Sequence, residues 1–223
     1  MENWTDLKPL ETDSLTEFAE ELQPMVEFEA AKYGHETTLE SQRYSTVAYV
    51  RTFADLRSIS NAVNDIGEPL KPGEARHLLL PGSYTPFFLI HALKEITNLQ
   101  IKNLHLVTLS HSAQNTIELL SMLDNGEVAN CWLIASHVFR AKNPELYNPM
   151  ADGLNDRKQH AMVCRTHVKV FLIEFSDGSK FTIEGSGNMR SCKSLEQAVI
   201  VRDDGLYHFH RRWIEGLFQT ETN

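Results

Sequence analysis

The sequence predicts an α/β protein with a mixed, mostly parallel sheet flanked by helices. Short apolar runs alternate with helical patterns along most of the chain, which is typical of strand–helix–strand units. Toward the C-terminus the apolar runs follow one another closely, and Asp177-Gly178 between two of them is a hairpin signal. The alternation therefore predicts parallel strands, and the late runs add a hairpin.

The first forty residues differ from the rest of the chain. Apolar residues repeat at helical intervals from Leu15 to Phe28 behind Ser14, which predicts an acidic amphipathic helix broken or kinked near Pro24. The stretch 34–43 has the character of a linker. We therefore expect an acidic N-terminal helical segment over residues 1–40 and one domain over residues 41–223.

Within the domain, strands and helices are assigned from the period of the apolar residues. Strands are expected over 46–50, 77–80, 104–109, 128–135, 161–175, 180–184 and 196–202. Helices are expected over 54–63, 86–96 and 113–123, with a short final helix around 213–218. The polar stretch 142–159 receives no assignment.

The net charge of −9 is concentrated at the N-terminus, because residues 1–40 hold eleven acids and two bases. The remainder is neutral overall, so an anionic substrate is not excluded. No apolar run approaches the roughly 18 residues that span a bilayer, and the chain starts without a basic-then-apolar leader. We expect a cytoplasmic protein without membrane contact. The spacing of Cys131, Cys164 and Cys192 does not suit zinc, so no metal is expected.

Two short motifs carry side chains suited to phosphate chemistry. An extended backbone around residue 168 places His167 and Lys169 on one face, so that a nucleophile and a cation share a surface. Beyond the hairpin signal the chain reaches Gly185-Ser186-Gly187-Asn188, where small residues allow a substrate to approach the backbone. Glu196 opens the next apolar run, and its carboxylate could return to the imidazole.

These residues resemble the signature of the phospholipase D superfamily: His-x-Lys, an intervening Asp, Gly-Ser-x-Asn and a later Glu. The matching residues are His167, Lys169, Gly185, Ser186, Asn188 and Glu196. Glu174 occupies the Asp position, and the interval from His167 to Asn188 is four residues longer than the common one, which a longer hairpin would explain. From about Leu104 to Ile214 the chain looks most like single-motif nuclease-type members, which implies a phospholipase D-like fold.

The resemblance implies a double displacement that needs neither metal nor cofactor. His167 would attack phosphorus and form a phosphohistidine, while Glu196 accepts the proton of the other ring nitrogen. Lys169, Asn188 and Ser186 would hold the non-bridging oxygens. The leaving group needs an acid, which in this family comes from a second copy of the motif. Because the chain holds one copy, the resemblance implies a homodimer.

Other residues are weaker candidates for substrate contact. Ser110 and His111 open a helix where a phosphate could bind, although Ser112 as a plain helix cap is the better interpretation. Arg190 and Lys193 flank the Asn188 loop and suit either a nucleic-acid backbone or solvent equally well. Gly185 and Gly187 are expected to line the substrate path.

Two further features have simpler interpretations. His208 and His210 are spaced like metal ligands on a strand, but no Cys or carboxylate partner stands nearby, so no site is expected. The acidic N-terminal helix is most simply docked on the surface. The alternative is that its charge covers the phosphate site or binds a partner.

The sequence thus predicts a dimeric, metal-independent phosphodiesterase, most plausibly a nuclease acting on DNA. A nuclease is favoured over a phospholipid hydrolase because nothing resembles a membrane-seeking surface. The alternative from another class is a catalytically silent module that keeps the fold to bind nucleic acid or protein.

Overall fold

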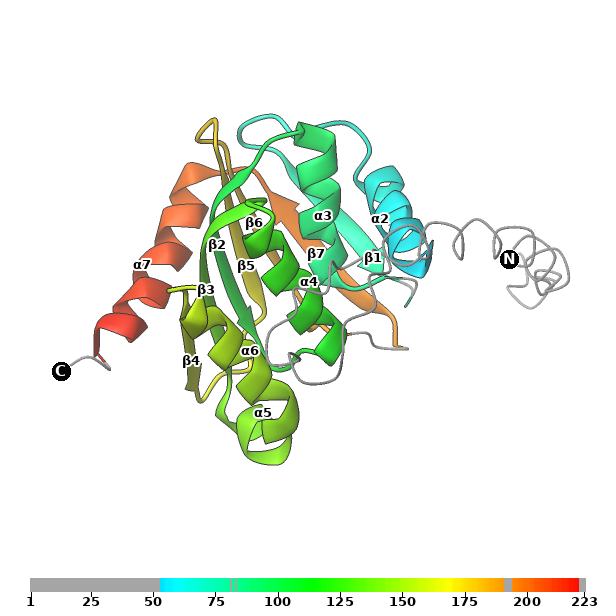
Figure 1. Ribbon diagram of the computed structural model, residues 1–223. Coiled ribbons are helices and arrows are strands. Elements are labelled where there is room, and N and C mark those ends of the chain that lie inside the picture. Colours follow the sequence, from blue (N-terminus) through cyan, green and yellow to red (C-terminus); the bar gives the residue numbers. More distant parts are fainter. Residues whose placement is uncertain (1–52, 81, 83, 191–193, 221–223) are drawn as a thin grey trace, which may run out of the picture. The chain divides into compact units, whose positions relative to one another are not determined.

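One seven-stranded sheet organises the part of the chain that the computed structural model describes, which is residues 53–80, 82, 84–190 and 194–220. The strand expected at 46–50, the acidic segment 1–40 and Lys193 lie outside these residues. The strands run in the spatial order β1-β7-β6-β5-β2-β3-β4 (Figure 1). Their bounds are β1 Ala75–Leu80, β2 Ile101–Thr108, β3 Val128–Ser136, β4 His160–Cys164, β5 Val170–Phe175, β6 Lys180–Gly185 and β7 Glu196–Val201.

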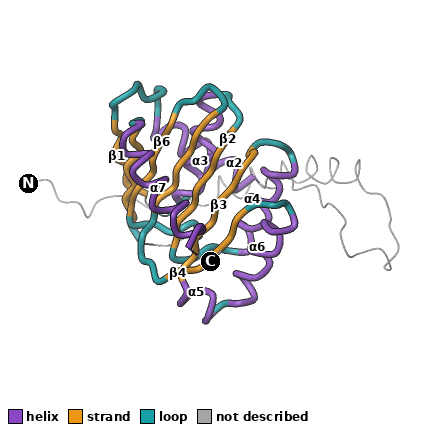
Figure 2. Tube along the Cα trace, turned by 90° about the vertical axis from the view of Figure 1, so that its left-hand side faces the viewer, coloured by secondary structure: helices purple, strands orange, loops and turns teal. Residues whose placement is uncertain are grey.

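Helices cover both faces of this sheet. Figure 1 and Figure 2 show α7 on one face, opposite α3 and α4. The helices are α2 Phe53–Ile66, α3 Pro86–Thr97, α4 Ala113–Asp124, α5 His137–Lys142, α6 Pro144–Asp156 and α7 Asp204–Thr220. Side chains of β5 pack into both layers: Phe171 and Ile173 join the core under α3 and α4, whereas Val170 and Leu172 join the core under α7. Burial on both faces explains the continuous apolar run of this strand.

The sheet is mixed, and the prediction that it is mostly parallel was wrong. β2, β3 and β4 are parallel neighbours, whereas β1-β7, β7-β6, β6-β5 and β5-β2 pair antiparallel. The alternation misled because α3 connects β1 to β2, which share a direction but are not neighbours. Three later strands, β7, β6 and β5, lie between them.

The hairpin between β5 and β6 is confirmed. Gly178 has φ +85°, a left-handed conformation that glycine adopts without strain. The carboxylate of Asp177 accepts a hydrogen bond from the Ser179 amide at 2.9 Å. The turn therefore uses both residues that signalled it.

Three expected elements differ from the structure. The run 161–175 is two strands, β4 and β5, separated by the polar residues 165–169. The stretch 142–159 contains α6, whose buried residues Tyr147, Met150, Ala151 and Leu154 follow a helical period that its prolines obscure. The final helix is longer than predicted and includes His208 and His210, which had been placed on a strand. Among the described helices, none combines the length and apolar character needed to cross a membrane.

Two buried histidines couple the fold to pH. Burial lowers the pKa of His105 to about 4, although its hydrogen bond to Glu215 acts in the opposite direction. Burial likewise lowers the pKa of His111 to about 4. The unfolded imidazole has a pKa of about 6.5. Above that pH both states are neutral; below it the unfolded chain binds protons that the folded chain does not, so acid favours unfolding.

We therefore predict that the free energy of unfolding falls as the pH decreases from about 6.5 to about 4, by up to about 1.4 kcal/mol per pH unit for each histidine. His111→Phe removes one of these titrations. Between pH 7 and pH 5 it should lose about 2 kcal/mol less than the parent chain in urea unfolding. Equal losses in the two proteins would show that His111 does not stay neutral in the folded state.

Candidate active site

The residues of the two motifs meet at one end of the sheet because of the strand directions. His167 and Lys169 lie in the extended segment that leads into β5, Ser186 and Asn188 follow the end of β6, and Glu196 begins β7. β5 and β6 are antiparallel, as are β6 and β7, so the start of β5, the end of β6 and the start of β7 share an edge. The C-terminal end of β2 reaches the same edge, since Val107 pairs with Val170.

His167 and Lys169 contact each other directly. Lys169 Nζ lies 3.0 Å from Nδ1 of His167 and donates to its carbonyl oxygen at 2.8 Å. Because an ammonium only donates, Nδ1 carries no proton in this contact, and the imidazole proton is on Nε2. His167 is exposed and Lys169 is half-buried. Burial lowers the pKa of Lys169, and the charge of Glu196 acts in the opposite direction.

Ser186 and Glu196 form the second pair. The Ser186 hydroxyl donates to Oε2 of Glu196 and accepts from the Gln197 amide at 3.0 Å. The Ser186 amide donates to the Gln197 carbonyl at 3.1 Å, which continues the pairing of β6 with β7 past the strand end. Glu196 therefore bonds Ser186 and lies near the ammonium of Lys169. The expected hydrogen bond from Glu196 to His167 is not among those of the described residues.

Asn188 is held by the end of β2. The Leu109 amide donates to Oδ1 of Asn188 at 3.2 Å. The amide of Met189, the residue after Asn188, donates to Oγ1 of Thr108 at 3.2 Å. Thr108 is fully buried and donates in turn to the Ser110 carbonyl at 3.0 Å. The oxygen of the Asn188 carboxamide is thus engaged, and its NH₂ group has no hydrogen bond to the described residues. Sequence reasoning missed Thr108, whose signal is a hydroxyl at the end of an apolar run.

The glycines of the loop are required by packing. A Cβ on Gly185 would overlap the Gln197 carbonyl, and one on Gly187 would lie 2.7 Å from Cγ of Pro86. The first helical residue of α3 therefore packs against the loop. Their small size serves protein contacts in this structure, in addition to any role in substrate approach.

Two shallow depressions flank this contact, and both are lined by Pro86 and Gly187. One is also lined by Lys169 and by Glu184, Phe171, Ile183, Gly185 and Ala198. The other is lined by Asn188, Arg190 and Glu196, together with Leu80, Gly82, Tyr84, Thr85 and Ser194. Lys169 thus lines one hollow and Asn188 and Glu196 line the other. His167 and Ser186 line neither of them.

Of the remaining candidates, Ser110 and His111 lie beneath the surface and Arg190 lines the second depression. Ser110 and His111 are buried, so their side chains do not face solvent. Ser112 caps α4, as expected, by accepting from the Asn115 amide at 3.2 Å. Arg190 is exposed at the edge of the second depression.

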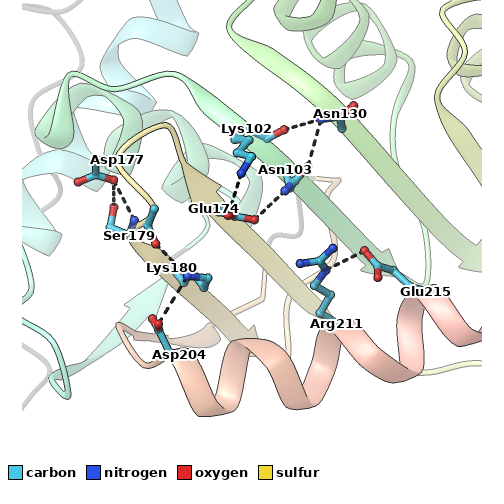
Figure 3. Close-up of polar contacts among 11 residues, drawn as sticks. Lys102, Asn103, Asn130, Glu174, Asp177, Ser179, Lys180, Asp204, Arg211 and Glu215 are labelled. Atoms are coloured by element: carbon cyan, nitrogen blue, oxygen red, sulfur yellow. Dashed lines mark hydrogen bonds and ion pairs between the residues drawn. The ribbon is translucent and has the colours of Figure 1, made fainter.

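Glu174, at the signature's Asp position, faces away from the site. Figure 3 shows it between β5 and β2, beside Lys102 and Asn103. Its Oε2 accepts from Asn103 Nδ2 at 2.6 Å, and its Oε1 lies 3.5 Å from Lys102 Nζ. Burial raises the pKa of Glu174, but the hydrogen bond from Asn103 and the charges of Lys102 and Lys180 outweigh burial and lower it. The residue joins strands and has no contact with the candidate active site.

The histidines of α7 do not form a metal site. Nε2 of His210 lies 3.0 Å from Oε1 of Glu184, and its Nδ1 accepts from the indole of Trp213 at 3.1 Å. No group of three or more His, Cys, Asp or Glu side chains among the described residues could hold a metal ion. His210 on α7 therefore contacts Glu184 on β6 and links the helix to the sheet.

Comparison with known proteins found only weak structural similarities. No protein-family model and no curated sequence matches the chain. A polyphosphate kinase from Porphyromonas gingivalis aligns with 64% of this chain and 26% of its own, at 13% identity and a TM-score of 0.47. The archaeal chromatin protein TrmBL2, described as binding DNA, aligns with 95% of this chain and 70% of its own, at 11% identity and a TM-score of 0.44.

A yeast tyrosyl-DNA phosphodiesterase 1 variant aligns with 57% of this chain and 32% of its own, at 12% identity and a TM-score of 0.36. The chain thus spans about a quarter of the kinase and a third of the phosphodiesterase. At these TM-scores the similarities carry no argument about activity, so function is argued from the residues of the site.

Thr108 gives a test of how the loop is held. In Thr108→Val the Met189 amide loses its acceptor in a buried position, which should lower the free energy of unfolding by about 1–3 kcal/mol. Thr108→Ser keeps the hydroxyl and should restore most of the amide's protection from hydrogen exchange. Unchanged exchange at Met189 in Thr108→Val would show that this hydrogen bond does not hold the loop.

Proposed function

We propose that this chain is a metal-independent phosphodiesterase of phospholipase D type that cleaves DNA through a phosphohistidine and completes its site by dimerisation. The observation that carries the proposal is the meeting of His167, Lys169, Ser186, Asn188 and Glu196 at one end of the sheet from three separate segments. These side chains supply a nucleophile, a cation, neutral donors and a carboxylate, which is the set that a phosphoryl displacement requires.

Substrate binding would exchange the contacts that these residues make with one another. Lys169 would leave Nδ1 of His167 for a non-bridging oxygen, which frees the imidazole lone pair. The Asn188 NH₂ group, oriented by the Leu109 amide, would donate to the same phosphate. The Ser186 hydroxyl would turn from Glu196 to the phosphate and release the carboxylate to accept the imidazole proton. The contacts of Lys169 and Ser186 with phosphate would each replace an existing contact of similar type, so little is lost on binding.

The chemistry then proceeds by two displacements at phosphorus. A nitrogen of His167 attacks, the P–O bond to the departing nucleoside breaks, and the leaving oxygen takes a proton from an acid. In the second step water attacks the phosphohistidine and the P–N bond breaks, which returns the histidine. The His167 of a second copy would serve as the acid in the first step and as the base in the second, because an imidazole can both donate and accept a proton.

The second candidate is a catalytically silent module that binds nucleic acid or protein. One observation favours it: Glu196 bonds Ser186, and its expected bond to His167 is not among those of the described residues. A module without activity could keep the present arrangement unchanged.

Cleavage in EDTA separates the two candidates. We expect the full-length chain to cleave single- or double-stranded oligonucleotides in the chelator, and His167→Ala to reduce the rate by at least about a thousandfold, because removal of a covalent nucleophile stops the first displacement. His137→Ala, at another exposed histidine, is the matched control and should retain activity. A phosphatidyl substrate in parallel tests the lipid alternative.

Trapping the intermediate completes the test. The expected product is an acid-labile, base-stable adduct in which the phosphorus on His167 still carries the retained nucleotide, found by mass spectrometry after an alkaline quench. Full activity of His167→Ala, or loss of cleavage in EDTA, would overturn the proposed mechanism. Analytical ultracentrifugation should give twice the mass of the chain. An enzyme that is active as a strict monomer would show that the mechanism does not require a dimer.

A further inference from the structure

The depression at the start of α3 has the features of an anion site. Thr85, the N-cap residue of α3, lines it together with Asn188, Arg190 and Glu196. α3 has twelve residues and no acidic side chain in its first turn, so no carboxylate of the helix itself offsets the positive end of its dipole. Helix N-termini of this kind attract phosphates.

Thr85 supplies an independent observation. Its residue exposure is 6%, its side chain does not cap α3, and its hydroxyl has no hydrogen-bond partner within the described chain. Buried hydroxyls are ordinarily paired, because leaving one unpaired destabilises the fold. A hydroxyl left unpaired where a depression meets a helix N-terminus suits an oxygen ligand that binds there.

Charges of both signs line the depression. Arg190 is exposed and brings a guanidinium, the side chain best shaped for phosphate. Glu196 brings a negative charge, but its Oε2 is bonded by the Ser186 hydroxyl and its charge acts on Lys169. The groups of this depression that suit an anion are therefore Arg190, the Thr85 hydroxyl and the start of α3.

This depression adjoins the one that contains Lys169, since Pro86 and Gly187 line both. From this arrangement we infer a subsite for the phosphate next to the scissile one along a DNA strand, bound by Thr85, Arg190 and the start of α3. The inference rests on the proposed function for the identity of the strand. With this subsite the preferred substrate would be a strand with successive phosphodiesters, in contrast to a phospholipid, which has a single phosphodiester.

Small substrates with one or two phosphates test the subsite. Each substrate is a thymidine that carries a nitrophenyl phosphodiester on one of its two hydroxyls. The other hydroxyl is either free or phosphorylated. Both positions of the nitrophenyl group are measured, because the strand could bind in either direction. In one arrangement the added phosphate should lower KM about tenfold in the parent enzyme, as expected for a charge-assisted contact. The readout is the ratio of the two KM values, which cancels general losses of activity.

The variants separate the contributions to that ratio. Thr85→Val, which removes only the hydroxyl, and Arg190→Gln should each bring the ratio close to one, whereas Thr85→Ser should preserve it. Arg140→Gln, at an exposed arginine on α5, is the charge-matched control and should leave the ratio as in the parent. If Thr85→Val fails to fold, Arg190→Gln still decides the result. A ratio unaffected by both substitutions, or a ratio of one in the parent, overturns the subsite.

A binding arm keeps this result distinct from the failure of the proposed function. The His167→Ala chain is titrated with a fluorescent dinucleotide that bears or lacks a terminal phosphate, followed by anisotropy. Tighter binding of the phosphorylated form that Arg190→Gln abolishes supports the subsite even if no substrate is cleaved. Equal binding of the two forms overturns it even if cleavage is observed.

Discussion

The candidate site depends on how the end of β2 holds the loop that follows β6. Two consecutive residues of the loop bond two consecutive residues of the strand end: Asn188 to the Leu109 amide and Met189 to the Thr108 hydroxyl. The first bond sets which way the carboxamide points, and the second is buried, so its loss would leave an unpaired amide. From the other side, Gly187 packs against Pro86 at the start of α3. The loop is therefore fixed by elements that contain none of the signature residues.

β5 separates two sets of polar residues that the sequence places close together. Lys169 leads into the strand on the same face as Phe171 and Ile173, whereas Glu174 belongs to the alternate face, where Asn103 and Lys102 bind it. Glu174 links β5 to β2 through Asn103 and Lys102 and lines neither depression. The substitution at this signature position thus leaves the chemistry of the other face untouched. One face of β5 therefore carries the polar contacts that link strands, and the other face leads to the candidate active site.

Local patterns were enough to predict much of the fold. The helical period of α3 and α4 and the turn chemistry of Asp177-Gly178 reside in adjacent residues, so they could be inferred from the sequence. The order of the strands could not be inferred in this way. β1 and β2 are consecutive strands in the sequence, connected by a helix, but three other strands separate them in the sheet. The period of α6 was hidden by prolines at its start and in its interior.

The candidate site shows the same limit. His167, Lys169, Ser186, Asn188 and Glu196 could be proposed as site residues because the order of a motif is itself a local signal. Thr108 and Leu109 were not, since their contacts to the loop span about eighty residues of chain and no periodicity reports them. Thr85 was missed because a hydroxyl at a helix start is ordinarily a cap, and only the structure shows that it does not cap α3.

The resting contacts of the site give it a defined ground state. Lys169 donates to His167, and Ser186 donates to Glu196, so the ammonium, the imidazole, the hydroxyl and the carboxylate are paired with one another. Pairing satisfies groups that are partly withdrawn from water, and it keeps the imidazole lone pair occupied while no phosphate is present. A phosphate can take over both donors at once because it offers several oxygens, whereas a neutral ligand cannot replace the ammonium contact on equal terms. Selectivity for an anion would thus arise from the exchange of these pairs, without a large basic surface.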